Sequence, residues 1–174
     1  RLGEEIMREI RRSRAFYDDP EVTDYVVALG NRLVTRGADS REDFQFFLMQ
    51  DRHINAFALP GGFIGLHTGL LLAAQSESEV AGVMAHEIAH ITQRHIARIL
   101  DQQRQSAVLG LAALAVSILA ARSNSDFAGA ASAFGQGAAI QNMLNFTRAH
   151  EREADRVGLQ ILEGAGFDPR GMAI

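Results

Sequence analysis

Apolar residues recur at helical spacing near the start of the chain. Leucine and isoleucine take every fourth position of the range 2–10 with charged residues between them, which predicts a short amphipathic helix. Asp19 and Pro20 then supply a capping carboxylate and a proline suited to the first helical turn. A second helix is therefore predicted from about Pro20 to about Arg36.

The pattern changes to short β-rich runs between residues 43 and 68. These runs are DFQFFLM, HINAFAL and FIGLHT, and Pro60 with the next two glycines separates the last two of them. Such runs, rich in aromatic and β-branched residues and bounded by turn residues, are typical of strands. A small antiparallel sheet with a turn at residues 60–62 is predicted.

Helix signals return after the predicted sheet. Ser76 and Glu79 form a capping box, and the apolar residues that follow predict a long helix reaching about Leu100. A last helix is predicted from about Asn142 to about Glu163, where glycines and a proline end it. Together with the sheet, these elements predict a mostly helical α+β fold.

Two segments between these helices are less regular. Residues 107–121 are an apolar run of 15, which is shorter than the roughly 20 residues that cross a bilayer. This run can be a buried helix, a flap over the site or a surface that touches membrane or a hydrophobic client. The stretch 123–139, rich in Gly, Ala and Ser, is predicted to be irregular or mobile.

Composition narrows the class of protein. The 174 residues, 47% hydrophobic and 22% charged, predict one globular domain over 1–174. A net charge of −4 argues against a nucleic-acid partner, and the absence of cysteine leaves only histidine and carboxylate as metal ligands. Residue 1 is Arg and no signal-peptide pattern is visible, so a processed or excised chain is expected.

The most informative string is H-E-I-A-H at residues 86–90, inside the predicted long helix. Positions four apart lie about 40° apart on a helix, so His86 and His90 can reach one ion. Glu87 lies about 100° from His86, so its carboxylate can face a water on that ion without being a ligand. The spacing predicts two metal ligands and one general base.

A catalytic zinc site needs a third protein ligand. Gln93 and Ile96 stand where a metzincin has glycine and histidine, which excludes that class. On a straight helix His95 points away from His86, so it is expected to support a ligand from behind or to lie on the surface. Glu151, with Asp155 one turn later, is the remaining candidate, although an exposed salt-bridged helix face explains these charges equally well.

Several strings resemble one family of enzymes. HEIAHITQRH, TRAHEREADRVG, INAFALPGG and the opening LGEEI with DDPEVTDYVVALGNRL are similar to the zinc metallopeptidases of the HtpX-like and CAAX prenyl protease family, in particular its soluble periplasmic branch. The resemblance covers nearly the whole chain. It implies a gluzincin-like zincin domain in which His86, His90 and the Glu151 of an E-x-x-x-D motif bind one Zn²⁺, with Asp155 as the supporting acid.

The resemblance also implies a setting. It points to the periplasm, to unfolded or misassembled envelope proteins as substrates, and to contacts with the outer-membrane assembly machinery or peripherally with membrane. Members of this branch commonly continue past a G-F-D-P segment into helical or repeat regions, whereas this chain ends at Ile174. The chain is therefore expected to be a fragment of a longer protein.

Other site roles follow from position along the chain. Arg148 or His150 could donate to the oxyanion of the reaction, although Arg148 could equally neutralise a nearby carboxylate. The segment containing Asn55, Ala56 and Phe57 is either a core strand or a sheet edge that pairs with an extended substrate. The histidines at 53 and 67 are assigned to structure or solvent.

These features predict a zinc-dependent endopeptidase. Its zinc ion would generate the nucleophile from water, and Glu87 would take the proton of that water. A zinc-stabilised chaperone or adaptor that binds outer-membrane proteins without cutting them is the alternative. The presence of Glu87 favours the enzyme, because a purely structural zinc site needs no base. A membrane-embedded protease is disfavoured by the lack of a spanning segment.

Overall fold

The computed structural model describes residues 2–38, 40, 42–105, 107–108 and 125–172, with side chains described outside 125–143 and 145. The chain forms two compact units, residues 1–96 with 152–174 and residues 97–151. They are called the first and the second unit below. The prediction of one domain over 1–174 stays a prediction.

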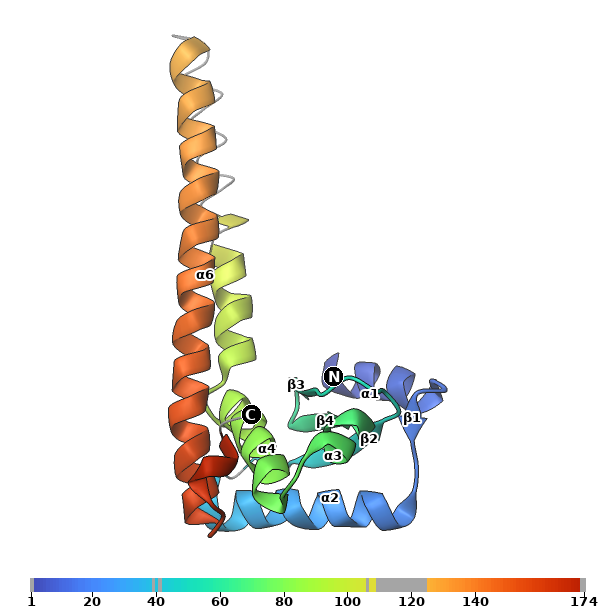
Figure 1. Cartoon of the computed structure of the whole chain (residues 1–174). Helices are drawn as coiled ribbons and strands as arrows, with labels where there is room; N and C mark the ends of the chain where they lie inside the picture. Colours follow the sequence, from blue (N-terminus) through green and yellow to red (C-terminus); the bar gives the residue numbers. More distant parts are fainter. Residues whose placement is uncertain (1, 39, 41, 106, 109–124, 173–174) are drawn as a thin grey trace. The chain divides into compact units, whose positions relative to one another are not determined.

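The first unit contains the sheet and most of the helices (Figure 1). Its elements are α1 (Leu2–Arg12), β1 (Phe16–Tyr17), α2 (Pro20–Leu33), a π-helical turn (Val34–Ala38), β2 (Gln45–Met49), β3 (Ala56–Leu59), β4 (Phe63–His67), α3 (Thr68–Ala73), α4 (Glu77–Thr92), the end of α6 (Ser125–Gly164) and a 3₁₀ turn (Pro169–Met172). The predicted α+β class is confirmed.

The sheet has four strands in the order β1-β2-β4-β3. β3 and β4 form an antiparallel hairpin in which Leu59 lies opposite Phe63, so the turn predicted at residues 60–62 is confirmed. β1 also pairs antiparallel with β2, but β2 and β4 run parallel. The sheet is thus mixed rather than antiparallel throughout, because β2 and β4 lie side by side and run in the same direction.

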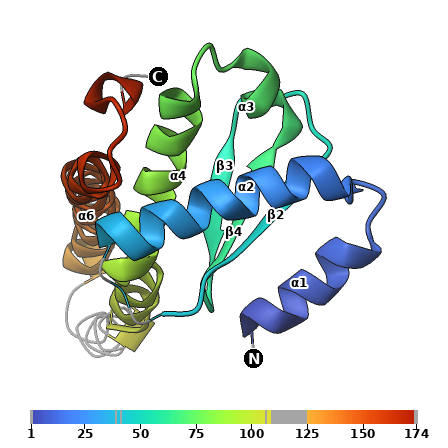
Figure 2. The same ribbon diagram turned by 90° about the horizontal axis from the view of Figure 1, so that it is seen from below.

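The alternation of side chains along β2 and β4 divides the core in two. Phe46 and Leu48 of β2 face a large core with residues of α2, α4 and the end of α6. Phe47, between them, faces the opposite side, where it packs with Phe63 and with Met7 of α1. α1 and α2 therefore cover opposite faces of the sheet (Figures 1 and 2). Each fully buried side chain of this kind contributes about 1.5–3 kcal/mol by leaving water.

Both predicted helix caps are present. The Asp19 carboxylate accepts hydrogen bonds from the backbone N–H groups of Glu21 and Val22 at 3.0 and 3.1 Å, ahead of Pro20 in the first turn of α2. The Ser76 hydroxyl accepts from the Glu79 N–H at 3.3 Å at the start of α4. These caps satisfy N–H groups that lack partners inside a helix. They fix where α2 and α4 begin.

The long helix predicted to reach Leu100 is interrupted. α4 ends at Thr92, Gln93 and Arg94 form a turn, and helix resumes over residues 95–105. Arg94 has a φ of 56°, in the left-handed region that non-glycine residues rarely adopt. The straight-helix prediction was therefore wrong beyond Thr92, and the direction of His95 changes with it.

The final helix is longer than predicted. α6 begins at Ser125 rather than near Asn142, so the described part of the stretch 123–139 is helical and the prediction of irregular structure was wrong there. Alanine, the best helix former, outnumbers glycine in this stretch. Most of the apolar run 107–121 lies outside the described residues. Across the helices that the structure describes, none pairs the length with the apolar character that crossing a bilayer requires.

Candidate metal centre

His86 and His90 lie one turn apart on the same face of α4, as predicted. Their Nε2 atoms face each other at 3.0 Å, and the ring centroids are 4.7 Å apart. Both side chains are half-buried, while the apolar residues between and around them, such as Ile88, are fully buried in the large core. The amphipathic pattern of α4 therefore anchors one face and presents the two imidazoles on the other.

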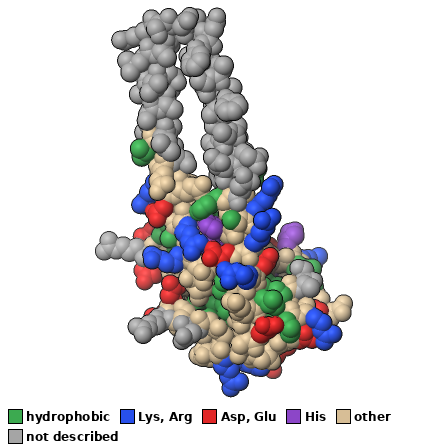
Figure 3. Space-filling view, turned by 90° about the vertical axis from the view of Figure 1, so that its left-hand side faces the viewer, with side chains coloured by type: hydrophobic (Ala, Val, Ile, Leu, Met, Phe, Trp, Pro, Cys, Tyr) green, Lys and Arg blue, Asp and Glu red, His purple; other side chains and the backbone are tan. Residues whose placement is uncertain are grey.

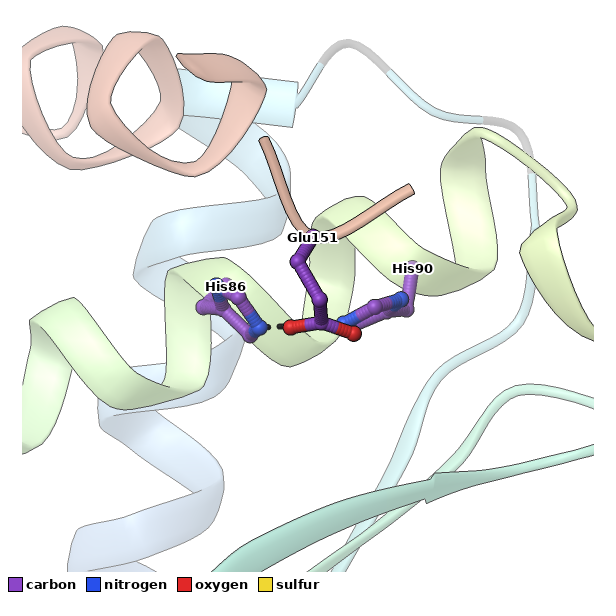
Figure 4. Close-up of side chains that lie close together, drawn as sticks. All are labelled: His86, His90 and Glu151. Carbon is purple, nitrogen blue, oxygen red and sulfur yellow. Dashed lines mark hydrogen bonds between the residues drawn. The ribbon is translucent and has the colours of Figure 1, made fainter. Parts of the chain in front are cut away.

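Glu151 completes a group of three metal-binding side chains. One ligand atom each from His86, His90 and Glu151 lies within 4.8 Å of the other two (Figure 4). Within the described residues this is the one group of three or more histidine, cysteine or acidic side chains that meets such a distance. The sequence left Glu151 undecided between ligand and surface charge, and this arrangement favours the ligand.

The donor atoms fit a small divalent cation. Two imidazole nitrogens bound at about 2.0–2.1 Å to a tetrahedral zinc ion lie about 3.3 Å apart. The Nε2 atoms are 3.0 Å apart, which small side-chain rotations would adjust. Two nitrogens and one carboxylate oxygen are also the donor types that zinc takes in catalytic sites, where a fourth position stays open. The residues present therefore suit the metal that the spacing predicts.

Asp155 lies behind His86. Its Oδ1 atom is 2.9 Å from His86 Nδ1, so the carboxylate can accept a hydrogen bond from Nδ1–H, the ring nitrogen that does not face His90. Gly158 makes this approach close, because a Cβ there would lie 3.1 Å from the backbone of His86. α6 can therefore lie directly against α4 at this point. The supporting role that the family resemblance implied for Asp155 stays a prediction.

His95 is a site residue that the sequence did not resolve. The break at Arg94 brings the His95 ring to His90, with their Nδ1 atoms 2.8 Å apart, and its Nε2 lies 3.0 Å from a carboxylate oxygen of Glu153. The side chain is 1% exposed, so the surface alternative was wrong, and the supporting alternative stays a prediction. No signal in the sequence marks this turn, since Arg94 has no preference for left-handed backbone.

The remaining predicted site residues lie outside the group of three metal-binding side chains. Glu87 is half-buried on α4 between the two histidines. Arg148 is exposed in the second unit, where His150 is 4% exposed and its ring lies 4.0 Å from that of Phe146, centroid to centroid. The roles of Glu87, Arg148 and His150 stay predictions. Figure 3 shows histidine at the molecular surface with acidic and basic side chains around it.

β3 is an edge strand that packs against α4. It begins at Ala56, so Asn55 lies in the segment just before it, where the Asn55 carbonyl accepts a hydrogen bond from the His67 N–H at 3.0 Å. In an antiparallel ladder, opposite residues alternate between pairs that exchange backbone hydrogen bonds and pairs that do not. Asn55 and His67 form a bonded pair, so Ala56 belongs to a non-bonded pair and Phe57 to the next bonded one. The backbone N–H and C=O of Ala56 therefore face away from β4. In the part of the chain that the structure describes, β3 has a strand neighbour on one side only.

The segment that leads into β3 is held by Asp51. The Asp51 carboxylate accepts from the backbone N–H of His53 at 2.9 Å and from its imidazole at 2.6 Å. These hydrogen bonds, the backbone one first, lower the pKa of Asp51 below its ordinary value. His53 and His67 lie outside the group of three ligands, in agreement with their assignment to structure or solvent.

Comparison with known proteins matches this chain to a family of peptidases and to named proteases. The model of peptidase family M48 matches residues 20–174. The putative beta-barrel assembly-enhancing protease of Vibrio cholerae is 46% identical over 98% of the chain, and the beta-barrel assembly-enhancing protease of Escherichia coli is 42% identical over 98%. The mitochondrial metalloendopeptidase OMA1 of Schizosaccharomyces pombe is 32% identical over 83% of the chain and 40% of its own length. The chain spans 35% of the length of the two bacterial relatives.

Proposed function

The chain belongs to peptidase family M48, and on that premise we propose that it is a zinc-dependent endopeptidase whose metal ligands are His86, His90 and Glu151. The observation that carries the proposal is the convergence of these three side chains, with ligand atoms within 4.8 Å of one another. Membership of the family implies a metal cofactor and a protein or peptide substrate. The identity of the metal as zinc is inferred from the two nitrogen donors and one oxygen donor.

A zinc ion in this site would lower the pKa of a coordinated water toward neutrality and polarise the carbonyl of the scissile bond. The three protein ligands leave a position open for that chemistry. His86 and His90 bind through Nε2, since their Nδ1 atoms face Asp155 and His95. Asp155 holds the His86 ring in its ligating orientation and tautomer.

Glu87 is proposed as the general base and then the general acid. Its carboxylate takes a proton from the attacking water and passes it to the nitrogen of the leaving amine, which allows the C–N bond to break. The position of Glu87 on α4, next to His86 and turned about 100° from it, supports this role. Arg148 or His150 would donate a hydrogen bond to the developing oxyanion.

The edge of β3 is proposed to hold the substrate. Ala56 directs its backbone N–H and C=O away from β4, so an extended peptide can add to the sheet there and lie along α4. Main-chain pairing requires an unfolded segment and reads little of its sequence. Segments of unfolded or misassembled envelope proteins are the proposed substrates, and the periplasm the proposed compartment, by analogy with relatives whose names refer to β-barrel assembly.

We expect Ala56→Pro to weaken substrate binding. Proline removes the outward N–H, and it is tolerated at the first residue of an edge strand because no bond to β4 is lost. One hydrogen bond contributes about 0.5–1.5 kcal/mol, so KM for unfolded casein should rise by about 2- to 10-fold with zinc content unchanged. Ala56→Ser keeps the N–H and serves as the control. Equal KM values for the two variants would show that substrate does not pair with this residue.

The proposed function is tested by metal analysis of the purified chain together with casein cleavage, with and without a chelator. We expect about one zinc ion per chain, cleavage of casein, loss of cleavage with the chelator and recovery on addition of zinc. Zinc without cleavage would contradict the enzyme and support the chaperone or adaptor. Cleavage that survives complete removal of metal would contradict the zinc mechanism.

A further inference from the structure

We propose that the buried His95 and the half-buried Glu153 form a positioning pair that fixes the tautomer and the ring orientation of the metal ligand His90. This inference deepens the proposed function and rests on it. The chain of contacts runs from His90 Nδ1 to His95 Nδ1 at 2.8 Å, and from His95 Nε2 to a Glu153 carboxylate oxygen at 3.0 Å. All three residues lie in the first unit.

The direction of each hydrogen bond follows from the ligand atom of His90. A neutral imidazole that offers the lone pair of Nε2 to a metal carries its proton on Nδ1. The Nδ1–H of His90 therefore donates to His95, whose Nδ1 must be unprotonated to accept. The proton of His95 is then on Nε2, where it donates to Glu153. The Glu153 carboxylate thus selects the tautomers of both the His95 and the His90 rings.

The backbone is shaped to make this contact. On an uninterrupted helix, residues five apart lie about 140° apart around the axis, which would separate the rings of His90 and His95. The turn at Gln93 and Arg94 brings them together, with ring centroids 4.9 Å apart and an interplanar angle of 76°. Arg94 sits at a φ of 56°, a conformation that costs a non-glycine residue free energy. The turn places His95 in contact with both His90 and Glu153.

The support of His90 is more deeply buried than the support of His86. The side chain of Asp155, which supports His86, is 66% exposed, whereas the side chains of His95 and Glu153 are 1% and 27% exposed. Water can therefore replace Asp155 more readily than it can replace His95. The His95 ring that contacts His90 is itself held by Glu153, whereas His86 contacts the more exposed Asp155. The supports of the two ligands therefore differ in rigidity. The buried support makes His90 the better fixed of the two ligands.

Two amide variants of His95 separate its two hydrogen bonds. The amide oxygen of His95→Asn lies near the former Nδ1 and can still accept from His90. His95→Gln reaches Glu153 with its amide nitrogen but leaves no acceptor beside His90. We expect the zinc dissociation constant, measured by competition with a chromophoric chelator, to rise by about 10- to 100-fold in His95→Gln and by no more than about 3-fold in His95→Asn. The cobalt-substituted proteins should show an altered visible spectrum only for His95→Gln.

Controls separate positioning from general damage to the fold. His67→Gln changes a mostly buried histidine of β4 outside the metal centre and should leave zinc affinity unchanged. If both His95 variants fail to fold by circular dichroism, Glu153 decides, because Glu153→Gln keeps an acceptor for His95 and Glu153→Ala does not. Zinc should then bind about 10-fold more weakly in Glu153→Ala than in Glu153→Gln.

The positioning pair would be overturned if the two His95 variants bound zinc with equal affinity. If the His95 variants do not fold, equal affinities in the two Glu153 variants would overturn it. In that case the histidine only fills space. Failure of the unmodified chain to bind zinc would instead overturn the proposed function itself. The two failures are therefore distinguishable in one titration series.

Discussion

A Glu87→Gln variant is expected to retain about one zinc ion per chain and to lose peptide hydrolysis by a factor of ~10³ or more, within the range of about 10²–10⁴ that a general base contributes. The amide has nearly the shape of the carboxylate but cannot accept a proton from water at neutral pH. Glu87 is not among the three side chains whose ligand atoms converge, so its change should leave the metal in place.

The measurement is kcat for casein or an extended peptide, with zinc counted in the same samples. Glu87→Asp is the companion variant, since it keeps the charge but withdraws the carboxylate by about one methylene, and geometry limits proton transfer. A purely electrostatic role would leave Glu87→Asp close to full activity. Undiminished hydrolysis by Glu87→Gln would remove this residue from the mechanism, and joint loss of zinc and activity would make it a structural residue of the site.

The helix starts and the paired histidines could be predicted because local chemistry decides them. Asp19 and Ser76 cap helices through bonds to N–H groups two or three residues away, and no distant part of the chain is needed. The convergence of His86 and His90 follows from the period of the helix alone. These features are predictable because residues only a few positions apart determine them.

The parallel pairing of β2 with β4 could not be read from periodicity. Alternating apolar residues identify each strand, but they do not say which strand lies beside it or in which direction. The turn at Arg94 was equally hidden, because no glycine or asparagine marks it. The turn places His95 beside Glu153, which is 58 residues further along the chain, and the local sequence does not indicate that contact. Features that depend on such non-local contacts escaped prediction.

The third ligand, Glu151, could be predicted only in part. Glu151 is about sixty residues from His90 in sequence, so spacing could not distinguish a ligand from a charge on a solvated helix face. The resemblance to a metallopeptidase family supplied the assignment, and the structure brings the three side chains together independently of it. The early start of α6 has another cause, since the alanines of this stretch favour helix more than its glycines and serines oppose it.

A Glu151→Gln variant is expected to bind zinc more weakly by a factor greater than about 100, the upper range for residues that only support a ligand. The amide retains the size and the hydrogen bonds of the side chain but loses its negative charge, so two neutral imidazoles alone would face the cation. Hydrolysis at low free zinc should fall with zinc occupancy. Competition with a chromophoric chelator measures the dissociation constant directly.

Glu163→Gln is the matched control, since it removes an exposed carboxylate from the same helix about 18 Å further along. If Glu151 only formed salt bridges on a solvated surface, both variants would change stability by at most about 1 kcal/mol and neither would change zinc affinity. A selective loss in Glu151→Gln therefore identifies a ligand rather than a surface charge. Equal zinc affinities in the two variants would remove the third ligand, and with it the open coordination position that peptide hydrolysis requires.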